Sequence, residues 1–381
     1  PGMRLLMLLA PAVCSDPIPV ARLFVDGPAA QPAVAVAPDG RVHVAAVRER
    51  RVWVVGSTGP VAESGTGLSW SAPVLLAPEL PVPGAMRRGP RIAVGKGAIV
   101  VTCPTAGRGE SEGNLVSFRS TDGGKAWSAP IPVNDQPRSA GEGFHDLAAL
   151  PDGELFVAWL DGRMNPRGQE IWLARSKDGG ETWSRNVRAF APPERTVCEC
   201  CPISVAAGAD GRVGIVFRHS LAGARDPYLL LSKREGRSFG SPVKLGRGTW
   251  RIAVCPMMEG ALAFSGDSVV CLAGREGRLE LVRPGTWEKT LGAGSHPAMG
   301  TGKDRLFFAY REGDSGPLLL GSTSLNGDVE SLSLAPPPAG FSRDFPAFCS
   351  GAGRAALVFE EGEGNAPPRV GLALLETRGG S

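Results

Sequence analysis

The sequence predicts an all-β protein, a seven-bladed β-propeller. The first observation is a repeat: residues 120–127 read Ser-Thr-Asp-Gly-Gly-Lys-Ala-Trp and residues 176–183 read Ser-Lys-Asp-Gly-Gly-Glu-Thr-Trp, which puts their tryptophans 56 residues apart. The second is that turn signals between short apolar runs keep this period. The third is the lack of any long helical period among the 381 residues. A repeat of this length with one hairpin turn per unit is typical of blades arranged radially about an axis.

The repeated stretch is interpreted as a structural hairpin turn. Its aspartate can accept hydrogen bonds from the N–H groups of the turn, and its paired glycines allow positive φ angles. The tryptophan begins the next strand and packs back across the hairpin. The residues expected to hold the two turns are Ser120, Asp122, Gly124, Trp127, Ser176, Asp178, Gly180 and Trp183.

Weaker markers extend the repeat toward both ends of the chain. The aromatic positions Trp70, Trp127, Trp183 and Phe239 are spaced by 57, 56 and 56 residues. A glycine turn between two apolar runs follows the same rhythm, at Gly40, Gly97, Gly153 and Gly211. One unit is therefore predicted to contain four short strands, with the glycine turn joining the first to the second and the Asp-Gly-Gly turn joining the third to the fourth.

Seven inner strands are expected, one for each blade. They begin near Pro32, Pro90, His145, Pro202, Met258, Pro297 and Pro346. The last unit has strands near 354–360 and 369–376, and then lacks a fourth strand. An unpaired strand edge promotes aggregation, so a ring is best closed by pairing its two ends. The segment Pro19–Val25 is apolar enough to supply the missing strand, which predicts closure by the N-terminus.

Composition and charge limit the classes of partner and the cellular location that we expect for the protein. The net charge is +3 with acids and bases interspersed, so no basic stripe for nucleic acid is expected. No apolar run reaches about 18 residues, so no transmembrane span is expected. Residues 3–14 place a cation before a short apolar run, which resembles a secretion signal. We therefore expect a leader at 1–16, one propeller domain at 17–381, and a periplasmic, secreted or lipid-anchored protein, with Cys14 as the alternative lipid attachment site.

The Ser-x-Asp-Gly-Gly-x-x-Trp pattern resembles the Asp-box of the sialidase and BNR-repeat families. That resemblance implies boxes at the blade periphery and six blades, which is the alternative blade count. It also implies an exo-glycosidase site with three arginines, an aspartate as acid/base and a tyrosine nucleophile. Gly89-Pro90-Arg91-Ile92-Ala93 is similar to the family's Arg-Ile-Pro motif, which makes Arg91 the first arginine, with Arg218, Arg311 and Tyr310 as the further matches. The catalytic set is incomplete, because residues 94–119 contain no aspartate.

Arginines recur in the loops expected on one face of the ring, at Arg48, Arg108, Arg163, Arg218, Arg275 and Arg311. Guanidinium groups offer a rigid bidentate fork for carboxylate, sulfate or phosphate. The pattern predicts a central funnel that binds an acidic glycan or another small anion, with Arg91, Arg163, Arg218 and Arg311 holding it. The alternative is that these are surface arginines paired with neighbouring glutamates. Among the histidines, His145 is the best candidate for chemistry, and its alternative is a structural bond to backbone.

Four cysteines are expected to gather on two adjacent loops. Cys198, Cys200 and Cys201 precede one inner strand, and Cys255 precedes the next. Three interpretations stay open: disulfides in an exported protein, a copper or zinc site of thiolates, and a reactive thiol. The functional alternatives to a glycan-directed propeller are therefore a metal-binding or redox-linked propeller and a non-catalytic interaction scaffold.

Overall fold

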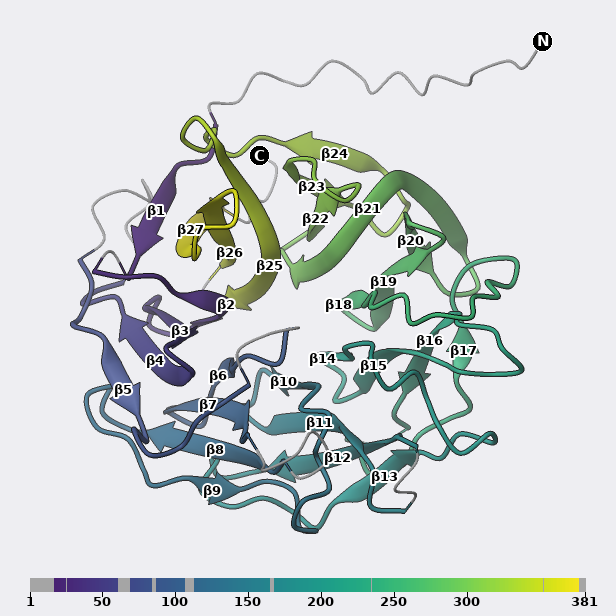
Figure 1. The fold of residues 1–381 in the computed structure, drawn as a ribbon, viewed down its shortest axis with the longest axis horizontal. Coiled ribbons are helices and arrows are strands. Elements are labelled where there is room, and N and C mark those ends of the chain that lie inside the picture. Colours follow the sequence, from purple (N-terminus) through teal and green to yellow (C-terminus); the bar gives the residue numbers. More distant parts are fainter. Residues whose placement is uncertain are drawn as a thin grey trace.

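A computed structural model describes residues 17–24, 26–60, 69–83, 87–106, 113–164, 168–233, 235–351 and 353–376. The described chain is all β, and its sheets follow one another around a central axis (Figure 1). The predicted β-propeller is confirmed. The expected leader at 1–16, including Cys14, lies outside the described residues. No helix among the described residues is long and apolar enough to span a membrane.

Four sheets each consist of four consecutive strands, the first of which lies nearest the axis (Figure 1). Their bounds are β2 (Ala30–Val36), β3 (Val42–Arg48), β4 (Arg51–Gly56) and β5 (Val74–Leu76); β6 (Arg91–Gly95), β7 (Ala98–Pro104), β8 (Leu115–Ser120) and β9 (Ile131–Pro132); β10 (His145–Ala149), β11 (Leu155–Asp161), β12 (Glu170–Ser176) and β13 (Val187–Phe190); and β14 (Ser204–Ala207), β15 (Val213–Arg218), β16 (Pro227–Leu231) and β17 (Val243–Lys244).

The next strands form one continuous sheet of seven. It contains β18 (Ala261–Ser265), β19 (Ser268–Arg275), β20 (Arg278–Arg283), β21 (Trp287–Thr301), β22 (Leu306–Glu312), β23 (Leu318–Thr323) and β24 (Val329–Leu332). The 15-residue β21 pairs first with β20 and then with β22. The sequence predicted an inner strand starting near Pro297, and the second part of β21 does line the axis from Pro297 to Met299. It is not a separate strand, because the chain accommodates the proline with a bulge and runs on without a break from the part that pairs with β20.

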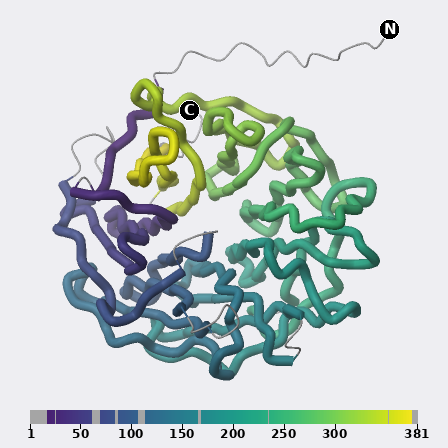
Figure 2. Tube along the Cα trace, viewed as in Figure 1, coloured from purple at the N-terminus to yellow at the C-terminus, as the bar shows by residue number. Residues whose placement is uncertain are grey.

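The propeller is closed by its own N-terminal strand. The outer strand β1 (Val20–Leu23) pairs antiparallel with β27 (Arg369–Glu376), which continues through β26 (Arg354–Glu363) to the inner β25 (Phe341–Gly351). Figure 2 shows the purple start of the described chain beside its yellow end. Closure by the segment 19–25 was predicted and is observed. The described residues thus form five separate four-stranded blades and one seven-stranded sheet, which corrects the predicted count of seven and its alternative of six.

The apolar core lies between neighbouring blades. Phe156 and Leu173 of one blade, for example, share a fully buried cluster with Ile215 of the next. Strands buried on both faces explain the apolar runs in the sequence. The blades are therefore held together mainly by the burial of side chains between sheets.

The Asp-Gly-Gly turns join the third strand of a blade to the fourth, and the second copy contacts the preceding blade. In the second copy, Ser176 Oγ donates to Asp178 Oδ1 (2.7 Å) and accepts from Gly180 N (2.8 Å). Gly180 has φ +83°, and a Cβ there would lie 2.7 Å from Val100 of the preceding blade. Trp183 Nε1 donates to Ser117 Oγ of that same blade at 2.8 Å. Both turns are far from the axis, as the sequence predicted for structural elements (Figure 1).

Three strands that reach the axis carry the same irregularity. The register shifts in β2, β21 and β25, each time at a residue that precedes a proline. These residues, Gln31, His296 and Phe345, have φ angles of 53°, 50° and 49°. A non-glycine residue in the left-handed region before proline is strained, and such strain concentrates at functional sites. The bulges turn these three residues out of the regular alternation of their strands.

Candidate functional site

A cavity of about 420 Å³ opens on the axis, where the inner strands begin. Every inner strand contributes to its lining, as does the second strand of the closing blade, β26. Its walls are mixed: Met299, Phe345 and Phe348 are apolar, while Gln31, Arg87, Arg91, Asp146 and Glu360 are polar. A concave site with a few polar groups among apolar walls is the usual form of a small-ligand site.

Both arginines of the cavity are paired with acids. Arg91 Nε donates to Asp146 Oδ1 at 3.1 Å, and Arg87 forms an ion pair with the buried Glu259. Arg91 also donates to the carbonyls of Gly89, Pro90 and Arg87. Burial raises the pKa of the Asp146 carboxyl, although Arg91 and the N–H groups of Val205 and Leu147 act in the opposite direction. Each positive charge in the lining is therefore already opposed by a carboxylate.

Gln31 is the unusual polar group of the cavity. Its backbone N–H donates to Glu360 Oε1 at 2.7 Å, and its side chain is 9% exposed. Neither Nε2 nor Oε1 of its amide has a hydrogen-bond partner among the described protein atoms. A buried amide without partners costs free energy, so this group is poised to bond a ligand. Burial raises the pKa of the adjacent Glu360, against the hydrogen bond from Gln31 N.

A second polar cluster borders the cavity at the strained residues of β21 and β25. His296 Nδ1 lies 2.6 Å from Asp344 Oδ1, and Arg311 forms an ion pair with the other oxygen of Asp344. The His296 ring also packs on Phe345, with centroids 4.2 Å apart. Burial favours a higher pKa for Asp344, but its bonds to His296 and Phe345 N and the charge of Arg311 outweigh burial and keep that pKa below its ordinary value.

Comparison with solved structures shows the same architecture in several proteins. An intramolecular trans-sialidase from Ruminococcus gnavus superposes with a TM-score of 0.53 and 10% identity, covering 91% of this chain and 93% of that one. The polysaccharide lyase Uly1 gives 0.54 and 12%, covering 91% and 90%. An α-L-arabinofuranosidase from Fusarium graminearum gives 0.51 and 12%, covering 91% and 93%. The fold is that of a sialidase-like β-propeller. No family model and no curated protein matches the sequence itself.

The residues predicted for this sialidase-like propeller are not brought together at one site. Arg91 alone of the predicted set lines the axial cavity. His145 is buried between two blades, where Nε2 contacts Thr102 Oγ1 (3.1 Å) and Nδ1 contacts the Gly143 carbonyl (3.3 Å). Burial, together with the charge of Arg91, lowers the pKa of His145 to about 3. The contacts of His145 match its structural alternative, and His145 does not line the axial cavity.

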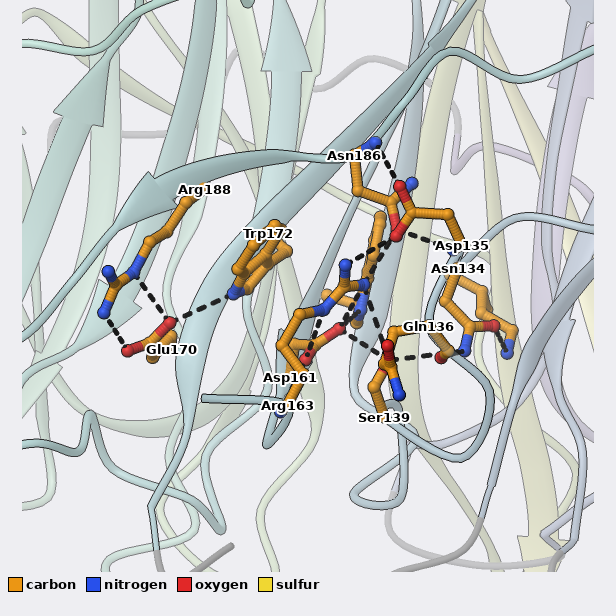
Figure 3. Close-up of polar contacts among 12 residues, drawn as sticks. Asn134, Asp135, Gln136, Ser139, Asp161, Arg163, Glu170, Trp172, Asn186 and Arg188 are labelled. Atoms are coloured by element: carbon orange, nitrogen blue, oxygen red, sulfur yellow. Dashed lines mark hydrogen bonds and ion pairs between the residues drawn. The ribbon is translucent and has the colours of Figure 1, made fainter. Parts of the chain in front are cut away.

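Arg163 belongs to a polar network between two blades, away from the axial cavity (Figure 3). Its guanidinium donates to both oxygens of Asp161 (3.0 and 2.9 Å) and to Asn186 Oδ1 (2.8 Å), and forms an ion pair with Asp135. It also lies over the Trp172 ring, 4.0 Å from the centroid. Each nitrogen of its guanidinium donates to a protein group, and Arg163 does not line the axial cavity, so the structure places it in a structural network and not in the predicted substrate site.

Arg218 and Tyr310 are also structural in their surroundings. Arg218 is buried and donates to three carbonyls, those of Met258 (3.1 Å), Gly274 (2.8 Å) and Arg225. Tyr310 packs in the core and contributes to a different cavity, of about 750 Å³, beside β22–β24 and β25. Burial raises the pKa of its hydroxyl. Neither residue lines the axial cavity, so neither can assist Arg91 there.

The four predicted cysteines do converge. Their sulfurs all lie within 4.8 Å of one another, and Cys200 is joined to Cys255 by a disulfide. Cys198 and Cys201 are buried free thiols whose sulfurs are 3.4 Å apart. Among the described residues Cys103, Cys271 and Cys349 are free cysteines outside this cluster, as expected for small apolar positions.

Sequence reasoning missed Gln31, Arg87, Asp146 and Glu360 as cavity residues. A local signal existed for Gln31, because glutamine, histidine and phenylalanine each precede the proline of an inner strand. A polar residue in such a dipeptide at the axis end of a blade is a candidate for ligand contact. No comparable signal marks Glu360, which is near the axis only because of the tertiary arrangement of β26 and β2.

Proposed function

We propose that the axial cavity binds a glycan and processes it by acid–base chemistry. The observation that carries this proposal is the Gln31 amide, which is nine-tenths buried, strained in its backbone and without a protein partner while it lines the cavity. A sugar hydroxyl both donates and accepts hydrogen bonds, so it matches an amide that offers one of each. The named structural neighbours, a trans-sialidase, an arabinofuranosidase and a polysaccharide lyase, support a glycan as the ligand class.

Two carboxyls of the cavity are suited to proton transfer. Asp146 and Glu360 both have a pKa that burial raises above the ordinary range. A carboxyl that remains protonated nearer neutral pH can donate its proton to a leaving oxygen. Glu360 has the freer position of the two, because Asp146 is occupied by Arg91 and by two backbone N–H groups. We therefore assign Glu360 as the acid and Gln31 as a sugar-binding residue.

The charges of the lining favour a neutral sugar over an acidic one. Arg87 and Arg91 face Glu259 and Asp146, and Glu360 adds a further carboxyl. A substrate carboxylate would have to displace one of these acids from its arginine, which costs an established ion pair. The acidic glycan, the funnel of arginines and the exported location stay predictions from the sequence.

A glycan array followed by calorimetry with the best ligands tests the proposal. We expect binding of neutral oligosaccharides, loss of affinity in Gln31→Met, and retained affinity with lost turnover in Glu360→Gln. An Asp210→Asn variant, which alters only a surface ion pair with Arg212, is the matched control. Preference for sialylated glycans would instead support the acidic glycan that the sequence predicted. Absence of binding to any glycan would contradict the proposal and favour an interaction scaffold.

A further inference from the structure

The cysteine cluster joins two loops that lead into the axial cavity. Cys198, Cys200 and Cys201 lie between β13 and β14, and Cys255 lies between β17 and β18. Cys198 and Cys201 are buried, while Cys200 and Cys255 are half-buried. The strands that follow these loops line the cavity with Ser204–Val205 and Ala261–Leu262. Whatever holds the four sulfurs together therefore fixes two sectors of the cavity wall.

The spacing of the sulfurs matches the edges of a tetrahedral metal site. A zinc–sulfur bond of about 2.3 Å places two ligands roughly 3.8 Å apart across a tetrahedron. Cys198 Sγ lies 3.8 Å from Cys200 Sγ and 3.4 Å from Cys201 Sγ. All four sulfurs lie within 4.8 Å of one another, so one small ion can be reached by all of them with little movement of the loops.

One sulfur of the cluster also receives a backbone hydrogen bond. The N–H of Met257 donates to Cys255 Sγ at 3.4 Å. N–H groups aimed at sulfur stabilise thiolates, which are the form that binds metal.

Two guanidinium groups compensate the negative charge that such a site would bring. Cys198 N donates to the Arg218 carbonyl at 2.9 Å, and the Arg218 guanidinium in turn donates to the carbonyl of Arg225, which places both arginines beside the cluster. Arg218 is held in place by three carbonyls, including that of Met258 in the Cys255 loop. Four thiolates around Zn²⁺ carry a charge of about −2, which two arginines can balance in a buried place. This gives Arg218 a role other than binding substrate at the axis.

We propose that Cys198, Cys200, Cys201 and Cys255 together bind one thiophilic d¹⁰ metal ion, Zn²⁺ or Cu⁺, once the Cys200–Cys255 disulfide is reduced. A dithiol or phosphine reductant supplies two electrons, and two protons from solvent complete the two thiols. Binding of the ion then releases thiol protons to the buffer. The disulfide of the oxidised form and the ion of the metal-bound form are two alternative cross-links between the same loops. This inference does not depend on the glycan proposal.

A spectroscopic titration tests the site. The full chain is reduced anaerobically with a phosphine, desalted, and titrated with Co²⁺, which reports thiolate coordination by its sulfur-to-metal charge-transfer absorption. We expect one equivalent to bind with the spectrum of a tetrahedral thiolate site and to be displaced by Zn²⁺. Cys198→Ser and Cys201→Ser should weaken binding by about tenfold or more. Cys349→Ser, which removes a free thiol outside the cluster, should leave it unchanged.

A second readout keeps the test independent of how well the variants fold. Reduced wild-type protein is alkylated with and without Zn²⁺, and the modified cysteines are identified by mass spectrometry. Protection of Cys198, Cys200, Cys201 and Cys255 by the ion supports the proposal. Reduced protein that shows no charge-transfer band and no protection would overturn it. A second disulfide between Cys198 and Cys201 that resists the reductant would overturn it in favour of a purely structural clasp.

Discussion

Two arginine–carboxylate clusters of this propeller differ in what they leave unsatisfied. In the network of Arg163 and Asp161, every nitrogen of the guanidinium and both oxygens of the carboxylate are engaged by protein groups (Figure 3). In the axial cavity Arg91 and Asp146 are paired too, but next to them the Gln31 amide is buried without a protein partner. Complete satisfaction indicates a structural role, whereas a polar group buried without a partner in a cavity indicates a place for a ligand.

The largest expected effect on stability is in the network of Arg163 and Asp161. Asp161 is fully buried and accepts from Ser139, Trp159 and Arg163. Asp161→Ala should lower the free energy of unfolding by about 3–5 kcal/mol, because the Arg163 charge is left without its buried partner. Urea unfolding measures this loss. Asp210→Asn, which removes the charge of a partly exposed pair with Arg212 and keeps an oxygen for the Arg212 N–H, should cost about 0–1 kcal/mol. Equal losses in the two variants would remove the distinction between the clusters.

The second effect concerns Asp344 beside the cavity. Asp344→Asn should lower the free energy of unfolding by about 1.5–3 kcal/mol at neutral pH, because bonds from His296 and Arg311 to a charged group are lost. The folded state lowers the pKa of Asp344, so its contribution is present above about pH 3.9 and disappears as the pH falls through the folded-state pKa. The stability gap between wild type and variant should therefore shrink in acid.

The contribution of Glu360 to the free energy of unfolding should depend on pH in the opposite direction. Burial raises its pKa in the folded state, so its contribution is complete below about pH 4.3 and is lost as the pH rises through the folded-state pKa. Relative to Glu360→Gln, wild-type stability should fall on going from acid to neutral pH. Urea unfolding of both variants across this range tests the pair of slopes. If the stability difference changed with pH in the same direction for both variants, the environments assigned to Asp344 and Glu360 would be contradicted.

The third effect separates binding from stability at Gln31. Gln31→Met keeps the approximate size of the side chain and removes the amide, so the free energy of unfolding should change by less than about 1 kcal/mol. Glycan affinity should fall by about tenfold, which corresponds to roughly 1.4 kcal/mol. Gln169→Met is a matched control, because the Gln169 amide oxygen is also buried without a partner but lies outside the cavity lining. A similar loss of affinity in the control would argue against a specific contact.

The smallest expected effect on stability is at Ser139, at the edge of the network of Arg163 and Asp161. Ser139→Ala removes one hydrogen bond to Asp161, at 2.8 Å, and leaves the arginine pair intact. We expect a loss of about 0.5–1.5 kcal/mol in the free energy of unfolding and no change in glycan binding. Calorimetry with the same glycan checks the second point. A change in affinity would mean that the network communicates with the cavity.

The architecture of this protein could be predicted from its sequence, because the local signals repeat. Asp-Gly-Gly turns, apolar runs and a missing last strand were enough to predict a propeller closed by the segment 19–25, and the pairing of Val20 with Ala373 agrees. The same signals predicted the convergence of four cysteines, since loops of adjacent blades lie side by side. Each of these predictions depends on strand order and turn position, which are written in short stretches of sequence.

Which polar residues meet at the axis depends on contacts between segments that are far apart in the sequence. Four arginines were predicted to hold one anion, yet Arg163 and Arg218 donate to groups of other blades, and among the described residues of that set only Arg91 reaches the cavity. The continuous β21 likewise depends on a bulge that lets Pro297 stay within one strand. The physical reason is that hydrogen-bond satisfaction and burial are properties of contacts between distant segments, such as Gln31 with Glu360.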